Sequence, residues 1–212
     1  AVEVAEAVEM AVSGGTNMTP VYAGLGAGAV SFVGTFGVLP RFRDLLKEPE
    51  NWTTMYNYLV DTGGVKSYSP EEAQAKAKRG ALLVDVRLAE KYNKYHPEGS
   101  INVPLYRPIQ AWDLPSNLRR AAFGFFGVFG TELNPEFKDL ALETLPKGKE
   151  IVLVCENGGS LENKAGVATG FQSRALKAAY FLRNAGFSKV SYCEGGMAAW
   201  LNRDLPLSEV EA

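Results

Sequence analysis

Apolar and polar residues follow an α/β pattern along the C-terminal two thirds of the chain. Short apolar, β-branched runs predict strands at 81–86, 151–154 and 190–193, and 101–103 is predicted to be short and extended. Helical patterns lie between and after these strands, at 135–144, 173–185 and 196–202. Ser69-Pro-Glu-Glu72 predicts the start of one more helix, with serine as its N-cap and proline in its first turn. Strands that alternate with helices indicate a parallel sheet with helices on both faces.

The N-terminal part has a different pattern. Residues 10–40 contain no charged side chain, and 21–39 is almost entirely apolar or small. About 20 such residues are enough to cross a bilayer. Gly24-Leu-Gly-Ala-Gly28 also fits the G-x-x-x-G spacing that lets helices approach closely in lipid. We therefore expect a transmembrane helix at 21–39, with a glycine-rich arm docked on another protein as the alternative.

The charges that flank this segment change sign. Acidic residues precede it and basic residues follow it: Glu3, Glu6 and Glu9, then Arg41, Arg43 and Lys47. The positive-inside rule then places the C-terminal domain on the basic side. The predicted organisation is a tail (1–20), a transmembrane helix (21–39), a connector helix (40–64), an α/β domain (65–207) and a second tail (208–212).

Composition limits the kinds of functional site and partner that can be expected. The net charge of −2 gives no support for a nucleic-acid partner. With one histidine, His96, a Ser-His-Asp site or a multi-histidine metal site is not expected. The two cysteines, Cys155 and Cys193, are not in a Cys-x-x-Cys pair, which argues against a zinc site and a disulfide scaffold. We expect no metal and no cofactor.

Cys155 is the candidate nucleophile. It ends the strand Ile151-Val-Leu-Val154 and precedes a loop with Gly158 and Gly159, after which a helix begins at Ser173-Arg174. Backbone N–H groups and the dipole at a helix N-terminus favour a thiolate at such a place. This position therefore indicates sulfur chemistry.

Other segments have mainly structural interpretations. Asp85 and Arg87 follow a strand and favour an ion pair, although they could also organise a binding loop. His96 before proline and Trp200 after Gly195-Gly196 are interpreted as structural, and Cys193 as a buried, unpaired thiol. The four phenylalanines within 121–130 either cover the sheet or form a sticky surface for a membrane or its proteins.

In order along the chain, these residues resemble the rhodanese-like domain. The resemblance covers about 65–207 and rests on five motifs: Leu82-Leu-Val-Asp-Val-Arg87, His96 to Pro104, Val152-Leu-Val-Cys155, Arg174 with Gly186-Phe187, and Gly195-Gly-x-x-Ala-Trp200. It implies about five parallel strands with helices on both faces. It also implies that Cys155 carries sulfane sulfur as a persulfide, that Arg174 stabilises anions, and that substrate is bound by Asp85, Arg87, Gly158, Gly159 and Ser173.

The sequence departs from this family in the loop. Family members usually have about four residues between the cysteine and the arginine, whereas residues 156–173 lie between Cys155 and Arg174 here. A loop this long is not expected to form a compact cradle by itself. Ala175 also stands where a serine commonly follows the arginine.

The loop pattern and Asn134-Pro-Glu-Phe137 resemble plant and algal chloroplast rhodanese-like proteins, some of which are anchored in thylakoids. The main hypothesis is therefore a binding or assembly module on a photosynthetic membrane complex. It would be tethered to the thylakoid membrane with its domain on the stromal side, and it would have weak or absent sulfurtransferase activity. An active sulfurtransferase with a sulfane-sulfur donor and acceptor is the alternative, and a phosphatase-like or arsenate-reductase-like pocket is the third.

Overall fold

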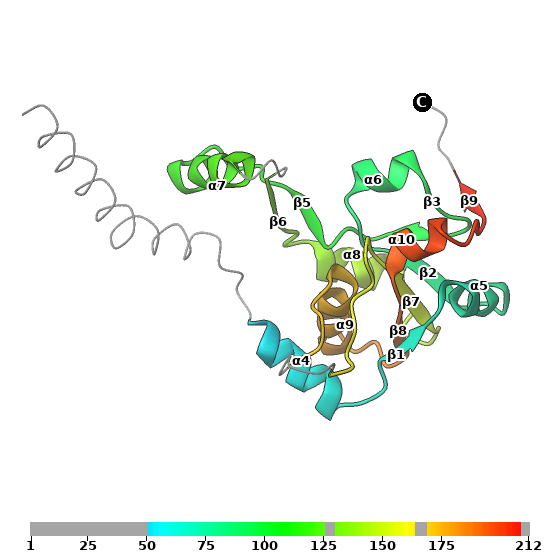
Figure 1. Cartoon of the computed structure of the whole chain (residues 1–212). Helices are drawn as coiled ribbons and strands as arrows, with labels where there is room; N and C mark the ends of the chain where they lie inside the picture. The colour runs from blue at the N-terminus through cyan, green and yellow to red at the C-terminus, as the bar shows by residue number, and fades with distance from the viewer. Residues whose placement is uncertain (1–50, 126–129, 164–168, 209–212) are drawn as a thin grey trace, which may run out of the picture.

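A five-stranded parallel sheet forms the centre of the computed structural model, which describes residues 51–125, 130–163 and 169–208 (Figure 1). The strand order is β1-β8-β7-β2-β4, and every neighbouring pair is parallel. The strands are β1 (Lys66–Tyr68), β2 (Leu82–Asp85), β4 (Ile101–Asn102), β7 (Ile151–Val154) and β8 (Val190–Cys193). The predicted α/β sheet is confirmed. β1 was not among the predicted strands, because its sequence Lys-Ser-Tyr is short and polar.

Alternate residues of each strand pack on opposite faces of the sheet. Val84, Leu153 and Tyr192 belong to the larger core cluster. Leu83 and Val152, one position earlier, belong to the smaller cluster on the other face. Because both faces are covered, all four residues of β7 are buried, which explains the uninterrupted apolar run in the sequence.

Three helices cover the larger core and two cover the smaller one (Figure 1). The first set is α4 (Trp52–Asp61), α8 (Phe137–Thr144) and α9 (Arg174–Asn184), and the second is α5 (Pro70–Lys78) and α10 (Gly196–Leu201). α5 begins as predicted: Ser69 Oγ accepts from Glu72 N, and the Glu72 carboxylate accepts from Ser69 N. Trp200 of α10 is 1% exposed and donates its Nε1–H to Pro206 O, so its interpretation as a core anchor is confirmed.

α4 is part of the folded body, although the domain was expected to begin at residue 65. Met55 and Leu59 of this helix are 2% and 1% exposed. On the same helix, Tyr58 packs edge to face on Tyr180 of α9, with ring centroids 5.1 Å apart. The segment predicted as a connector therefore contributes to the core.

Two short antiparallel pairs complete the described fold. β3 (His96–Pro97) pairs with β9 (Leu207–Ser208), and α6 (Ala89–Lys94) precedes β3. His96 is buried, stacks on Tyr92 and makes a 2.9 Å hydrogen bond from Nδ1 to Tyr92 O, so its interpretation as structural is confirmed.

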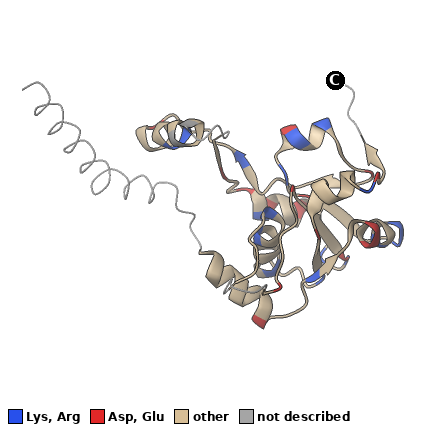
Figure 2. Cartoon of the chain, in the orientation of Figure 1, with Lys and Arg blue, Asp and Glu red and all other residues tan. Residues whose placement is uncertain are grey.

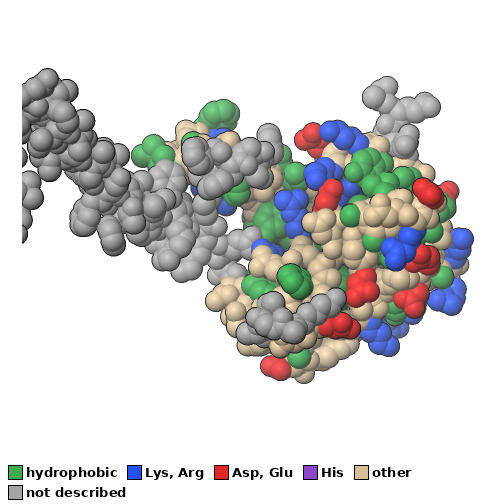
Figure 3. All heavy atoms as spheres, viewed as in Figure 1, with side chains coloured by type: hydrophobic (Ala, Val, Ile, Leu, Met, Phe, Trp, Pro, Cys, Tyr) green, Lys and Arg blue, Asp and Glu red, His purple; other side chains and the backbone are tan. Residues whose placement is uncertain are grey.

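Between the two strands of the second pair lies a segment, residues 109–125, that is named the arm here. β5 (Tyr106–Pro108) pairs with β6 (Thr131–Leu133), and α7 (Leu114–Phe125) lies between them in sequence and away from the sheet layers in Figure 1. This helix contains basic but no acidic residues, as Figure 2 shows. Apolar side chains lie on the arm's surface in Figure 3, and Trp112 and Leu114 are 81% and 72% exposed.

The predicted transmembrane helix at 21–39 lies outside the described residues. Among the helices that the structure describes, none has the length and apolar character needed to span a bilayer.

Candidate active site

Cys155 lies at the carboxyl end of β7, at the centre of the sheet, and its side chain is 2% exposed. The backbone after this strand is fixed by α10. The Cys155 carbonyl accepts from Met197 N at 2.8 Å, and the Glu156 carbonyl accepts from Ala198 N at 3.1 Å. The first turn of α10 therefore sets the direction in which the chain leaves the strand.

Gly158 and Gly159 turn the chain back toward α9. Both have positive φ angles, +74° and +77°, which favour glycine. A Cβ at Gly159 would lie 2.6 Å from Ser173 Oγ, and Ser173 Oγ donates a 2.7 Å hydrogen bond to Gly158 O. Three of the predicted site residues are thus brought together at the start of α9.

The long loop is closed at its base. Ser160 and Phe171 form an antiparallel bridge, in which Ser160 N donates to Phe171 O at 3.0 Å. The chain leaves at Leu161 and returns at Gly170, and these four residues are named the neck here. The insertion therefore branches from a compact ring instead of separating Cys155 from α9. The bridge shortens the effective length of the loop, and the expectation that the loop forms no compact cradle around the thiolate stays a prediction.

Arg174 is the first residue of α9, directly after its N-cap. Ser173 Oγ accepts the cap hydrogen bond from Leu176 N at 3.2 Å. The Arg174 guanidinium lies over the Tyr106 ring, with Cζ 4.9 Å from the centroid. Its observed partner is thus an aromatic face on β5.

Two residues beside Arg174, Lys177 and Tyr106, were not predicted from the sequence as part of the site. Lys177 is 6% exposed, and its Nζ donates to Tyr106 Oη at 3.1 Å. Tyr106 is thus shared by two cations from consecutive turns of α9. The spacing of Arg174 and Lys177, three residues apart on one helix, was a signal for a common face. Nothing in the sequence indicated that Tyr106 would meet them.

Asp85 and Arg87 form a buried ion pair at the end of β2. Both are 0% exposed, and the guanidinium binds the carboxylate in a bidentate manner, with Nη2 2.8 Å from Oδ2. Arg87 Nη2 also donates to Tyr95 O at 2.6 Å. This contact joins β2 to the segment before β3, so the ion-pair interpretation is confirmed, and a role in substrate binding stays a prediction.

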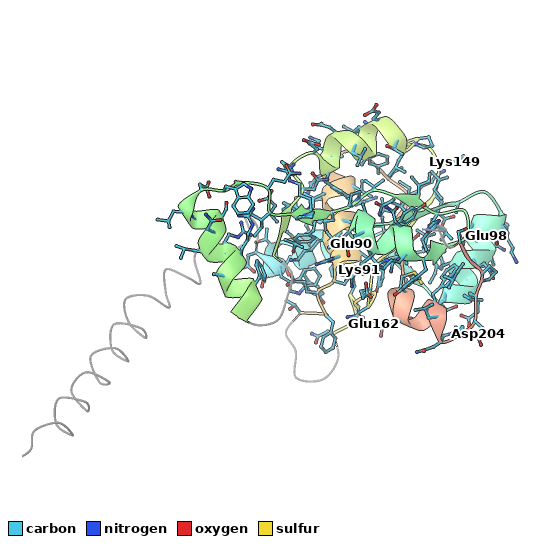
Figure 4. The ribbon with its side chains drawn as sticks, turned by 90° about the horizontal axis from the view of Figure 1, so that it is seen from above. Glu90, Lys91, Glu98, Lys149, Glu162 and Asp204 are labelled. Atoms are coloured by element: carbon cyan, nitrogen blue, oxygen red, sulfur yellow. The ribbon has the colours of Figure 1, made fainter. Side chains whose placement is uncertain are left out.

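The outer rim of the site is charged. Lys91 of α6, labelled in Figure 4, forms a 3.0 Å salt bridge with Glu156, next to the cysteine. Both side chains are more than 40% exposed, so the bridge contributes little to stability. In the described part of the chain, no three His, Cys, Asp or Glu side chains are grouped as a metal site would require.

Cys193 packs on the face of the sheet opposite Cys155. Cys193 belongs to the smaller core cluster and Cys155 to the larger one. Both thiols are free, and Cys193 is 0% exposed. Burial raises the pKa of Cys193 to about 12. It is therefore a protonated core residue at neutral pH, and its predicted burial without a disulfide partner is confirmed.

A cysteine at the carboxyl end of a central parallel strand, with an arginine at the start of the following helix, defines a rhodanese-type α/β domain. The sequence profile of the Rhodanese-like domain family matches residues 69–203. This range is more than half of the chain, so the protein belongs to the rhodanese-like family.

Three chloroplastic proteins of Arabidopsis thaliana are similar to the chain. Rhodanese-like domain-containing protein 14 is 38% identical over 149 residues, which are 69% of this chain and 66% of that protein. Rhodanese-like domain-containing protein 11 is 26% identical over 93% of this chain and 64% of that protein. The chain thus spans slightly less than two thirds of the length of these two relatives. Thiosulfate sulfurtransferase 16 is 27% identical over 60% of this chain and 79% of that protein.

A solved structure is also similar to the chain, at low sequence identity. The solution structure of a rhodanese-like domain from Anabaena sp. is 19% identical, covers 71% of this chain and 83% of that one, and has a TM-score of 0.44.

Proposed function

We propose that this protein is a membrane-tethered rhodanese-like module that binds a photosynthetic membrane complex and has low intrinsic sulfurtransferase activity. The burial of Cys155 carries this proposal, because a thiol that is 2% exposed meets a soluble substrate only after its loop opens. The Arg174 guanidinium, which would stabilise a substrate anion, lies on Tyr106.

The chloroplast is the proposed compartment, because three of the similar proteins are chloroplastic by name. Within it, segment 21–39 would anchor the chain in the thylakoid membrane, and the basic residues after it favour a stromal position for the domain. The arm that carries α7 supports a binding role. Trp112 is highly exposed, and the Arg120 guanidinium stacks on its ring, with Cζ 4.3 Å from the centroid. Exposed aromatic and arginine side chains are common anchors at protein interfaces.

An active sulfurtransferase is the second candidate, and the closed neck favours it. Because Gly158 and Ser173 stay in contact, the cysteine and the start of α9 keep a compact arrangement. In this reaction the Cys155 thiolate attacks the sulfane sulfur of thiosulfate, the S–S bond breaks and sulfite leaves. A nucleophile such as cyanide or a thiol then takes the outer sulfur and regenerates the thiolate.

Turnover with thiosulfate and cyanide tests the choice between these functions. We expect it to be on the order of 10²–10³ below that of a short-loop rhodanese, the cost of one misplaced anion-stabilising donor. Cys155→Ser is the control for background reaction. A turnover equal to that of a short-loop rhodanese, abolished in Cys155→Ser, would establish the sulfurtransferase instead.

Carbonate extraction of membranes that contain the full-length chain tests the tether. We expect the protein to stay in the membrane fraction, because an apolar segment of about 20 residues holds a chain in the bilayer. A variant that lacks 21–39 should be released. Release of the unmodified protein at the same carbonate concentration contradicts an integral span.

A further inference from the structure

The neck of the Cys155 loop is held from outside by α4. The Trp52 indole Nε1 donates to Gly170 O at 3.1 Å, and the Tyr56 hydroxyl donates to Leu161 O at 3.3 Å. These two acceptors belong to the two opposite limbs of the neck. α4 therefore forms one hydrogen bond with the limb that leaves at Leu161 and one with the limb that returns at Gly170.

The two donors are placed for this by helix geometry. Trp52 and Tyr56 are four residues apart, so their side chains lie on one face of α4. Their rings are in contact, with centroids 5.9 Å apart. Both are half-buried, whereas Met55 and Leu59 of the same helix are buried in the domain. The core contacts fix α4, and α4 in turn fixes the neck.

A third contact comes from the sheet. The amide N of Leu161 donates to Tyr192 Oη at 3.3 Å, and Tyr192 lies on β8, next to β7. Leu161 is thus held through its N–H by the sheet and through its carbonyl by α4. Besides the α4 contacts, the described residues give the neck this bond, the bridge between Ser160 and Phe171, and a 3.1 Å hydrogen bond from Glu162 N to Ser160 Oγ.

We propose that Trp52 and Tyr56 are positioning residues of the Cys155 site, which hold the neck in its closed arrangement. Few residues separate the neck from the Cys155 site, because the chain continues from the neck to Gly159 on one limb and to Ser173 on the other. A Cβ at Gly159 would touch both Phe171 O and Ser173 Oγ, within 2.7 Å, so the limbs cannot separate without moving the ring next to Cys155. The inference rests on the proposed function for the role of Cys155 as the reactive thiol.

The test is the rate at which iodoacetamide alkylates each cysteine of the full-length protein, read by mass spectrometry. The loss of two ordinary hydrogen bonds shifts the equilibrium between the closed and the open neck by about tenfold to hundredfold toward the open form. We expect Trp52→Phe with Tyr56→Phe to raise the rate at Cys155 by about tenfold or more. Tyr56→Phe alone, which removes one hydroxyl, should give a smaller rise of several-fold.

Cys193 is the internal control, since it is fully buried on the other face of the sheet. Its rate should not change in the variants. Tyr58→Phe is the matched control on the same helix, because the Tyr58 ring packs on Tyr180 of α9; its Cys155 rate should equal that of the unmodified protein. An unchanged Cys155 rate in the double variant overturns the inference, and so does an equal rise at both cysteines, which would report general destabilisation. These outcomes do not depend on thiosulfate turnover, so the inference and the proposed function can fail separately.

Discussion

Arg87→Met is expected to lower the free energy of unfolding by about 3–5 kcal/mol, the usual cost of removing one partner of a buried ion pair. The Asp85 carboxylate is 0% exposed and would lose the guanidinium that neutralises it. Methionine retains much of the volume, so the effect reports the charge and not a cavity. The loss of the hydrogen bond to Tyr95 O adds to it. Urea unfolding followed by circular dichroism measures the change.

Two further variants show whether the unpaired charge is the cause. Lys91→Met breaks the exposed bridge to Glu156 and should cost no more than about 1 kcal/mol. Asp85→Asn combined with Arg87→Met removes both charges. In the unmodified protein the backbone N–H of Arg87 donates to Asp85 Oδ1 at 2.9 Å, and the asparagine keeps an oxygen that can accept this hydrogen bond. It should recover part of the stability that Arg87→Met alone loses. If the double variant is no more stable than Arg87→Met alone, the cost comes from packing instead.

The central strands could be predicted because burial on both faces leaves a continuous apolar signal. Ile151–Val154 and Val190–Cys193 have the predicted bounds for this reason. The edge strand β1 has no such signal, since its residues are polar and its pairing with β8 depends on backbone hydrogen bonds. The β5–β6 pair is also set by contacts far apart in sequence. Short strands of this kind are defined by their partners and not by their own residues.

The candidate site was predictable in its residues but not in its shape. Cys155, Gly158 and Ser173 lie where a strand end, a turn and an N-cap require them. Sequence spacing treated 156–173 as one loop, whereas the Ser160–Phe171 bridge divides it into a ring and an insertion. The neck is also bound by α4, more than 100 residues earlier in the chain, and such a contact has no local signal. Tyr106 also had no local signal, because it contacts Arg174 and Lys177 from a distant part of the chain.

Gly158→Ala is expected to destabilise the protein by about 2–5 kcal/mol and to disturb the Cys155 loop directly. A residue other than glycine pays about 1–2 kcal/mol at a φ of +74°. The new Cβ would also collide with the backbone of Gly195 and Gly196 and lie 2.6 Å from Cys193 O. Overpacking of this kind adds about 1–3 kcal/mol. These atoms are backbone at the end of β8 and the start of α10, so they cannot move aside as a flexible side chain would.

Gly99→Ala separates the two causes. Gly99 has nearly the same φ angle, +71°, but nothing lies within 4 Å of a Cβ at that position. Its variant should therefore show only the conformational cost, about 1–2 kcal/mol. In Gly158→Ala, the shift of the α10 turn should also move the carbonyl of Cys155, which Met197 N binds, and so speed the alkylation of Cys155 relative to Cys193. Equal losses of stability in the two variants, with no change in the ratio of cysteine labelling, would show that the loop and α10 are not packed as tightly as the backbone contacts indicate.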